Sequence, residues 1–188
     1  MENYEYCIVK KSAMKKSLIL ILFAFCTLPF ALAQQGVIQL PATGQTTSYY
    51  PGDDGDLQIG IPIPASRFTD NGDGSVTDAL TGHMWAKDAN LIATRNPSFD
   101  QDRTVGDGDI DWKTALSYVE MLNNENYLGY NDWRMPNMVE LRSLVNLGLP
   151  DFALPTDHPF INLKDLYWSS TSSEEMRSLA IGVLLQEH

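Results

Sequence analysis

The chain has 188 residues, with 24 acidic and 13 basic side chains and a net charge of −11 at neutral pH. This length fits one domain of ordinary size. The excess of acidic side chains repels nucleic acid and sulfated polysaccharide at long range, so we expect no broad polyanion-binding surface and no nucleic-acid partner.

Residues 14–33 have the layout of a secretory signal peptide. Two lysines precede an apolar run, and Ala31-Leu32-Ala33 provides the small-x-small pattern of a cleavage site. The alternative is a membrane anchor, but Pro29 interrupts the run before the roughly 18 apolar residues of a membrane span accumulate. We predict that residues 1–33 are a signal peptide, with Met14 as an alternative start.

Cleavage after Ala33 would change the composition of the exported chain. Both cysteines, Cys7 and Cys26, would be lost, which excludes a disulfide framework and a cysteine nucleophile. Four of the 13 basic and two of the 24 acidic residues would also be removed, giving a net charge of −13. We expect an exported protein of the periplasm, cell surface or medium, without membrane attachment after cleavage.

Residues 34–65 are rich in Gly, Pro, Thr and Gln. The prolines of PGDDGD at 51–56 and IPIP at 61–64 exclude helix and central strands, because proline lacks an N–H donor. We predict an extended arm or linker with a short strand near residues 57–59. The compact domain then covers residues 66–188.

The first part of the domain predicts a hairpin and a further strand. The turn dipeptides NG and DG at 71–74 tolerate positive φ, so we expect Phe68 and Val76 to face each other across the hairpin. A second turn at 81–82 leads into a strand at 84–85. The aspartates and glycines of the first turn resemble those of a calcium-binding loop, but the conformational needs of the turn itself explain them.

Two segments predict helices that bury one apolar face. The first begins with Asp111 as N-cap, carries apolar residues on one face through Leu122, and ends in the asparagine-rich segment that follows. The second begins at Asn137, with Glu140 at capping-box spacing, and ends at Gly148.

Strand-like LYWSSTS at 166–172 and a final apolar run at 179–185 complete the pattern. This order of elements indicates an α+β fold in which two helices pack on a mainly antiparallel sheet.

An acidic loop before the first helix offers the best metal candidates. Asp107, Asp109 and Asp111 alternate, and carboxylate oxygens at such spacing suit Ca²⁺. The EF-hand pattern fails because Gly108 lies inside the triplet and no glutamate closes the loop, and Asp111 already caps a helix. We favour a solvated acidic loop and no cofactor, with Ca²⁺ as the alternative.

The sequence shows no recognisable catalytic set. His83 lies in a predicted strand, and Asp157-His158 is a neighbouring pair in a loop. There is no H-E-x-x-H pattern, nucleophile elbow, P-loop or dinucleotide fingerprint. We therefore do not expect an enzyme.

Aromatic residues are the remaining indication of function. Trp85, Trp112, Trp133 and Trp168 are spread over four predicted elements, close to Asp, Asn and Arg residues that could bind sugar hydroxyls. The alternative is that these tryptophans fill the core. Arg134 could fork onto a carboxylate and lock its loop.

Several motifs in order resemble the Lcl C-terminal domain family. They are RFTDNGDGSVTDALTGHMWAKDAN, DWKTALSYVEMLN, GYNDWRMPNMVELRSLV, LPTDHPF and YWSSTS, and they cover residues 66–173. The resemblance implies an exported bacterial domain, related in fold to C-type-lectin-like domains and the formylglycine-generating enzyme. The best-known relative is the head of a collagen-like adhesin that binds sulfated glycosaminoglycans and forms a trimer.

The resemblance implies a binding module for a carbohydrate or a cell-surface polymer, with a homo-oligomer as a further expectation. It carries over no catalytic residues. Its DWRMPN and YWSST positions look like fold signatures, and from them we take five candidate ligand residues: Asp132, Trp133, Arg134, Tyr167 and Trp168.

Two departures from the family pattern matter. The chain has no collagen-like stalk, and its negative charge argues against a glycosaminoglycan ligand. It ends at His188, where family members usually continue through aromatic-rich strands to a closing Val-Arg motif. We expect a domain incomplete at its C-terminus, with its last strands missing and open sheet edges. The alternatives are an enzyme on a formylglycine-generating type of fold and a truncated remnant without function.

Overall fold

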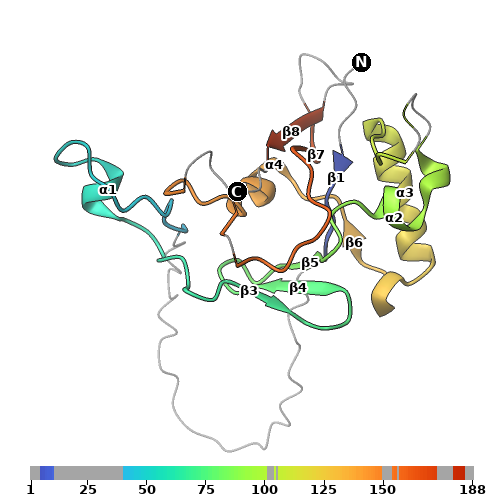
Figure 1. The fold of residues 1–188 in the computed structure, drawn as a ribbon, viewed down its shortest axis with the longest axis horizontal. Helices are drawn as coiled ribbons and strands as arrows, with labels where there is room; N and C mark the ends of the chain where they lie inside the picture. Colours follow the sequence, from blue (N-terminus) through green and yellow to red (C-terminus); the bar gives the residue numbers. More distant parts are fainter. Residues whose placement is uncertain are drawn as a thin grey trace, which may run out of the picture.

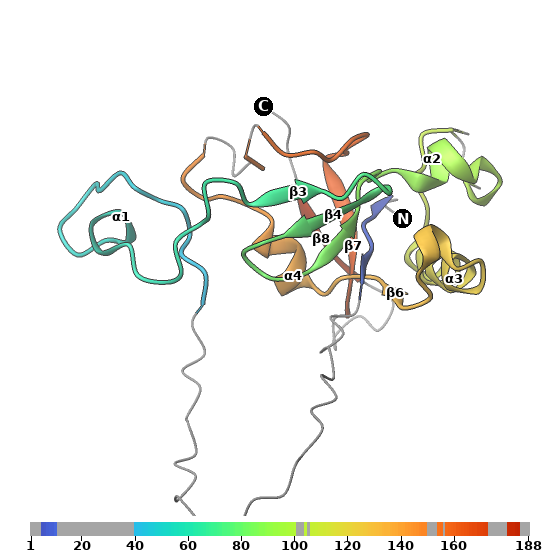
Figure 2. The same ribbon diagram turned by 90° about the horizontal axis from the view of Figure 1, so that it is seen from below.

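The computed structural model describes residues 5–10, 40–100, 104, 106–149, 154–155, 157–172 and 180–184. These residues form an α+β fold, with strands in the middle and the larger helices beside them (Figures 1 and 2). A five-stranded sheet has the order β3-β4-β5-β2-β6, and a three-stranded sheet has the order β1-β7-β8. All neighbouring strands are antiparallel except β1 and β7, so the expected α+β class with a mainly antiparallel sheet is confirmed.

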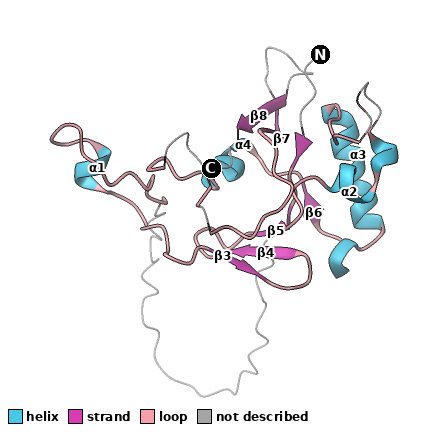
Figure 3. Cartoon of the chain, in the orientation of Figure 1, coloured by secondary structure: helices cyan, strands magenta, loops and turns pink. Residues whose placement is uncertain are grey.

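Figure 3 shows short strands and helices joined by long loops. The strands are β1 (Glu5–Tyr6), β2 (Val9–Lys10), β3 (Phe68–Asp70), β4 (Ser75–Asp78), β5 (Met84–Ala86), β6 (Trp133–Arg134), β7 (Leu166–Ser172) and β8 (Ala180–Leu184). The α-helices are α1 (Asp54–Leu57), α2 (Leu91–Arg95), α3 (Trp112–Asn124) and α4 (Met138–Ser143), and short 3-10 turns cover Pro97–Phe99 and Tyr127–Gly129.

The predicted hairpin is present as β3 and β4, but its register differs from the expectation. Gly72 and Gly74 both have positive φ, and residues 71–74 form a four-residue loop between the two strands. Asp70 therefore pairs with Val76, and the expected pairing of Phe68 with Val76 was wrong. The strand predicted after the second turn is β5, which pairs with β4.

Helix α3 begins where the sequence predicts. The Asp111 carboxylate accepts a hydrogen bond from the Thr114 N–H at 2.9 Å, which satisfies one of the free donors of the first turn. Helix α4 begins with the predicted capping box, in which Asn137 and Glu140 each accept from the other's N–H at 2.9 and 2.8 Å.

Helix α4 is shorter than predicted. The carbonyl groups at its end and the Leu147 N–H form hydrogen bonds with other segments instead of continuing the helix. The Arg67 guanidinium donates to the carbonyl oxygens of Ser143 (2.6 Å) and Leu144 (3.3 Å). The Leu147 N–H donates to the Thr43 carbonyl at 2.9 Å. These contacts end the helix at Ser143 and leave Gly148 outside it.

The predicted strand near residues 57–59 was wrong. Residues 54–57 form the one-turn helix α1, capped by Asp53, which accepts from the Asp56 N–H at 2.9 Å. The exclusion of helix by the neighbouring prolines was therefore too strong. Helix α2 was also not predicted.

The buried apolar side chains form two clusters on opposite faces of the strands. One cluster packs against α3 and includes Ile8, Trp133 and Trp168. The other packs against α4 and includes Val9 and Trp85. Strand β2 and the residue before it contribute to both clusters, so the core continues through the sheet.

The predicted signal peptide lies mostly outside the described residues, which resume at residue 40. Its first part is described, because residues 5–10 form β1 and β2. Within the described part of the chain, no helix is long and apolar enough to cross a membrane.

Candidate ligand groove

An open groove of about 430 Å³ lies between α3, β6, the start of α4 and β7. Its walls come from segments far apart in the sequence. They are formed by Leu116, Val119, Glu120, Asn123, Trp133, Arg134, Met135, Asn137 and Ser170.

The floor of the groove is apolar and rigidly held. Trp133 is 2% exposed and Met135 is also buried, whereas Leu116 on α3 is 38% exposed at the edge. The Asn123 side chain donates to the Trp133 carbonyl (2.8 Å) and accepts from its N–H (2.7 Å). This pair of bonds fixes β6 against α3, so the groove is formed before any ligand enters.

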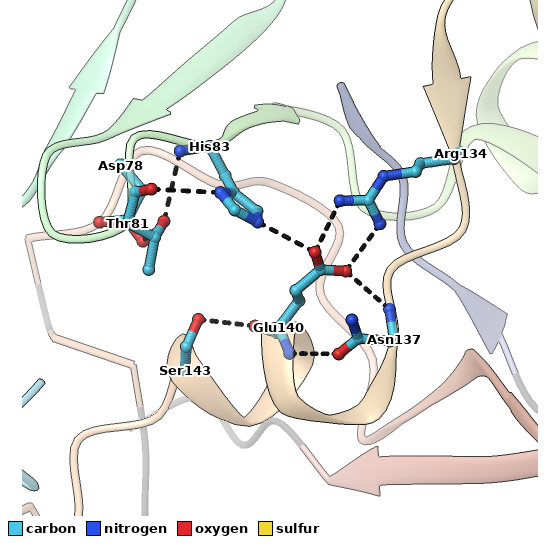
Figure 4. A network of polar contacts seen from close by, with 7 residues as sticks. All are labelled: Asp78, Thr81, His83, Arg134, Asn137, Glu140 and Ser143. Atoms are coloured by element: carbon cyan, nitrogen blue, oxygen red, sulfur yellow. Dashed lines mark hydrogen bonds and ion pairs between the residues drawn. The ribbon is translucent and has the colours of Figure 1, made fainter. Parts of the chain in front are cut away.

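One wall of the groove ends in a polar network (Figure 4). Arg134 reaches Glu140 through two parallel hydrogen bonds of 2.7 and 2.6 Å. The Glu140 carboxylate also accepts from the Asn137 N–H at 2.8 Å and lies 3.1 Å from the His83 Nε2 atom. The predicted fork of Arg134 onto a carboxylate is therefore confirmed, and it ties β6 to α4.

This network keeps Glu140 ionised. Burial by itself raises the pKa of Glu140, but the hydrogen bonds from Arg134, Asn137 and His83 outweigh it and lower the pKa from 4.5 to about 2. Arg134, Asn137 and His83 all direct hydrogen-bond donors at the Glu140 carboxylate. Its negative charge is therefore compensated within the protein, and the carboxylate is not free to take a proton from a substrate.

A second ion pair lies at the other end of α4. Arg67 and Asp78 are both buried and meet through bonds of 2.9 and 2.8 Å. Burial raises the pKa of Asp78, but the hydrogen bonds and charge of Arg67 outweigh it and the pKa is lowered. Because Arg67 also holds the end of α4, this pair joins the hairpin to that helix.

The groove brings together two of the five candidate ligand residues. Trp133 forms its floor and Arg134 its wall, while Asp132 lies just outside its lining. Tyr167 and Trp168 are buried in the core. The Trp168 indole N–H donates to the Ile110 carbonyl at 2.9 Å, and the Tyr167 hydroxyl accepts from the Lys164 N–H at 2.8 Å.

The sequence interpretation missed the contribution of α3 to this groove. The four lining residues of that helix are spaced by three, one and three positions, which places them on one face: Leu116, Val119, Glu120 and Asn123. This spacing could have predicted that the four residues share one face of the helix. Whether that face is exposed depends on strands that are distant in the sequence, so the spacing alone does not predict the groove.

Two of the three aspartates considered for Ca²⁺ serve the backbone, and the third, Asp109, forms an ion pair with Lys164 at 3.9 Å. Asp107 accepts from the Asp109 N–H at 2.9 Å, and Asp111 caps α3. Asp100 accepts from the N–H groups of Gly106 and Gly108. No three acidic, histidine or cysteine side chains converge as a metal site anywhere in the described ranges.

The Asp157-His158 pair does not belong to the groove. Asp157 is exposed, and His158 is half-buried with its ring 5.9 Å from that of Phe160.

Comparison with known proteins gives one result. The family model described as the Lcl C-terminal domain matches residues 74–188, which include all the lining residues of the groove. No curated protein and no solved structure shows a significant match.

Proposed function

Because this chain belongs to the Lcl C-terminal domain family, we propose that it is an exported binding module for a neutral carbohydrate segment of a cell-surface polymer. The groove between α3 and β6 is the proposed binding site, and no chemical conversion of the ligand is proposed. The α+β arrangement is compatible with the C-type-lectin-like fold that the family resemblance implies.

The observation that carries this proposal is the mixture of surfaces in one preformed groove. Leu116 offers apolar contact for the C–H face of a sugar ring above the buried floor, and Asn123, Asn137 and Ser170 line the same hollow. Sites for small ligands commonly combine an apolar lining with a few placed polar groups. The groove is open enough for one unit of a longer polymer.

Charge favours a neutral ligand over an anionic one. The guanidinium of Arg134 is already neutralised by Glu140, and the exposed Glu120 adds a negative charge to the opposite wall. The chain as a whole carries a net charge of −11. A sulfated or carboxylated polymer would therefore meet repulsion both at long range and in the groove.

Leu116 gives the direct test, because it lies at the exposed edge of the groove. We expect binding of neutral oligosaccharides on a glycan array, and Leu116→Gln should weaken that binding at least about tenfold, since a polar group replaces the apolar contact. Leu147→Gln is the matched control, because Leu147 is 43% exposed, similar to the 38% of Leu116, and lies outside the groove.

Binding should be measured by calorimetry with the strongest array ligand. The proposal would be rejected if no neutral glycan bound. It would also be rejected if Leu116→Gln and Leu147→Gln bound the ligand equally well. Preference for sulfated glycans would show that the charge argument fails.

A further inference from the structure

Strand β2 lies inside the five-stranded sheet, between β5 and β6. Val9 is in register with Trp85 on one side and Arg134 on the other. The Ala86 N–H donates to the Ile8 carbonyl at 3.3 Å. In the described part of the chain, β6 stands at the edge of this sheet and joins it through β2.

Side chains around β2 fill space on both faces of the sheet. Ile8 is buried in the cluster against α3, whereas Cys7 and Val9 are buried in the cluster against α4. The ammonium group of Lys10 lies 3.7 Å from the centre of the Tyr130 ring, a cation–π contact. This alternation fixes one register, since a shift by one residue would exchange the two faces.

The same short segment also joins the second sheet. Strand β1 pairs in parallel with β7, so residues 5–10 contact both sheets in succession (Figure 1). In sequence, however, the segment lies within the first part of the predicted signal peptide, residues 1–33. Cleavage after Ala33 would break its covalent link to the rest of the domain.

We propose that β5, β6 and β7 form an acceptor site for one extended strand, and that residues 5–10 are its occupant. The strand is held by backbone pairing and by burial of alternate side chains, the same physics by which extended peptides add to sheets in other proteins. The covalent connection is not needed to hold it. A free peptide of the same sequence is therefore able to take its place.

Cys7 reports directly on whether the strand is in place. The thiol is buried, and burial raises its pKa to about 12, so it reacts with thiol reagents only after the strand leaves. The experiment uses the full chain with Cys26→Ser, so that Cys7 is the one remaining cysteine of the two in the sequence. The competitor is a synthetic peptide of residues 2–11 that carries Cys7→Ser.

We expect slow labelling of Cys7 in the chain alone and fast labelling with the peptide. A tethered strand has an effective concentration of about 1 mM, so peptide at about 1 mM should displace about half of the tethered strands at equilibrium. A brief pulse of reagent should then label about half as much Cys7 as in the urea-unfolded chain. A control peptide with Val9→Lys should leave Cys7 protected, because it would bury a charge.

A matched pair of chain variants provides a second measurement. Val9 is 0% exposed and Val139 on α4 is 72% exposed, so Val9→Lys should release the strand and speed the labelling of Cys7, whereas Val139→Lys should not. If the Val9→Lys chain fails to fold, the peptide competition, which uses a chain with an unchanged Val9, still tests whether the strand can be displaced.

Three outcomes would overturn the proposal. Fast labelling of Cys7 without peptide would show that the strand is not seated. Full protection at about 10 mM peptide would show that the strand is not exchangeable. Equal displacement by the control peptide would show that the site does not recognise the alternating pattern.

Discussion

At the scale of single residues, Glu140 connects three elements with one carboxylate. It closes the capping box of α4, holds Arg134 of β6 and contacts His83 at the entrance to β5. Each of these contacts needs the ionised form, since every partner is a donor or a cation. Protonation therefore weakens three connections at once.

This arrangement predicts a pH dependence of stability with a definite sign. The pKa of Glu140 is about 2 in the folded protein, below its ordinary value of 4.5, so its contribution is complete above pH 4.5 and is lost as pH falls toward 2. That contribution is roughly 3 kcal/mol at most. Glu140→Gln should lower the free energy of unfolding at pH 7 by about 1–3 kcal/mol and remove this part of the acid dependence.

Urea unfolding between pH 7 and pH 2 measures the effect. Glu120→Gln is the control, because Glu120 is exposed and should leave the profile unchanged. A Glu140→Gln variant that loses as much stability at pH 2 as at pH 7 would show that the charge of Glu140 is not the cause.

At the scale of elements, the capping role of Asp111 can be separated from a metal-binding role. Asp111→Ala should lower the free energy of unfolding by about 1 kcal/mol, because the Thr114 N–H loses its acceptor. Asp111→Ser should restore most of that loss, since serine is also a good cap. Thermal melts with Ca²⁺ and with a chelator should coincide for all three chains. A Ca²⁺-dependent rise in melting temperature that both variants abolish would favour the metal instead.

The caps and turns could be predicted from the sequence because they are local. Asp111, Asn137 and the glycines of the first hairpin act on residues a few positions away, so short motifs identify them. The end of α4 could not be predicted, because Arg67 and Thr43 reach it from distant segments. The error in hairpin register has a different cause, because the turn dipeptides do not fix the number of loop residues, and that number decides the pairing.

The candidate site was predictable only in part. The sequence predicted that Arg134 forks onto a carboxylate and that Glu140 belongs to a capping box. The structure joins these two features in one network. The burial of Tyr167 and Trp168 depends on packing between both sheets and α3, which no short motif encodes. Aromatic residues beside polar ones are therefore weak evidence for a sugar site until their exposure is known.

At the scale of the whole molecule, the two core clusters meet at β2 and the residue before it. Ile8 packs in the cluster against α3 and its neighbour Val9 in the cluster against α4, so loss of either cluster removes the support of the strand between them. The shared strand makes the described domain one cooperative unit even though its elements are short.

This cooperativity leads to a prediction for two matched core variants. Leu122 in α3 and Leu141 in α4 are both 0% exposed, one in each cluster, so Leu122→Ala and Leu141→Ala should each cost about 2 kcal/mol or more. Hydrogen exchange read by mass spectrometry should then accelerate at least about thirtyfold in both helices for either variant, because both helices exchange through the same global opening. Acceleration confined to the helix that carries the substitution would show two independent units, and the shared strand would then not couple the clusters.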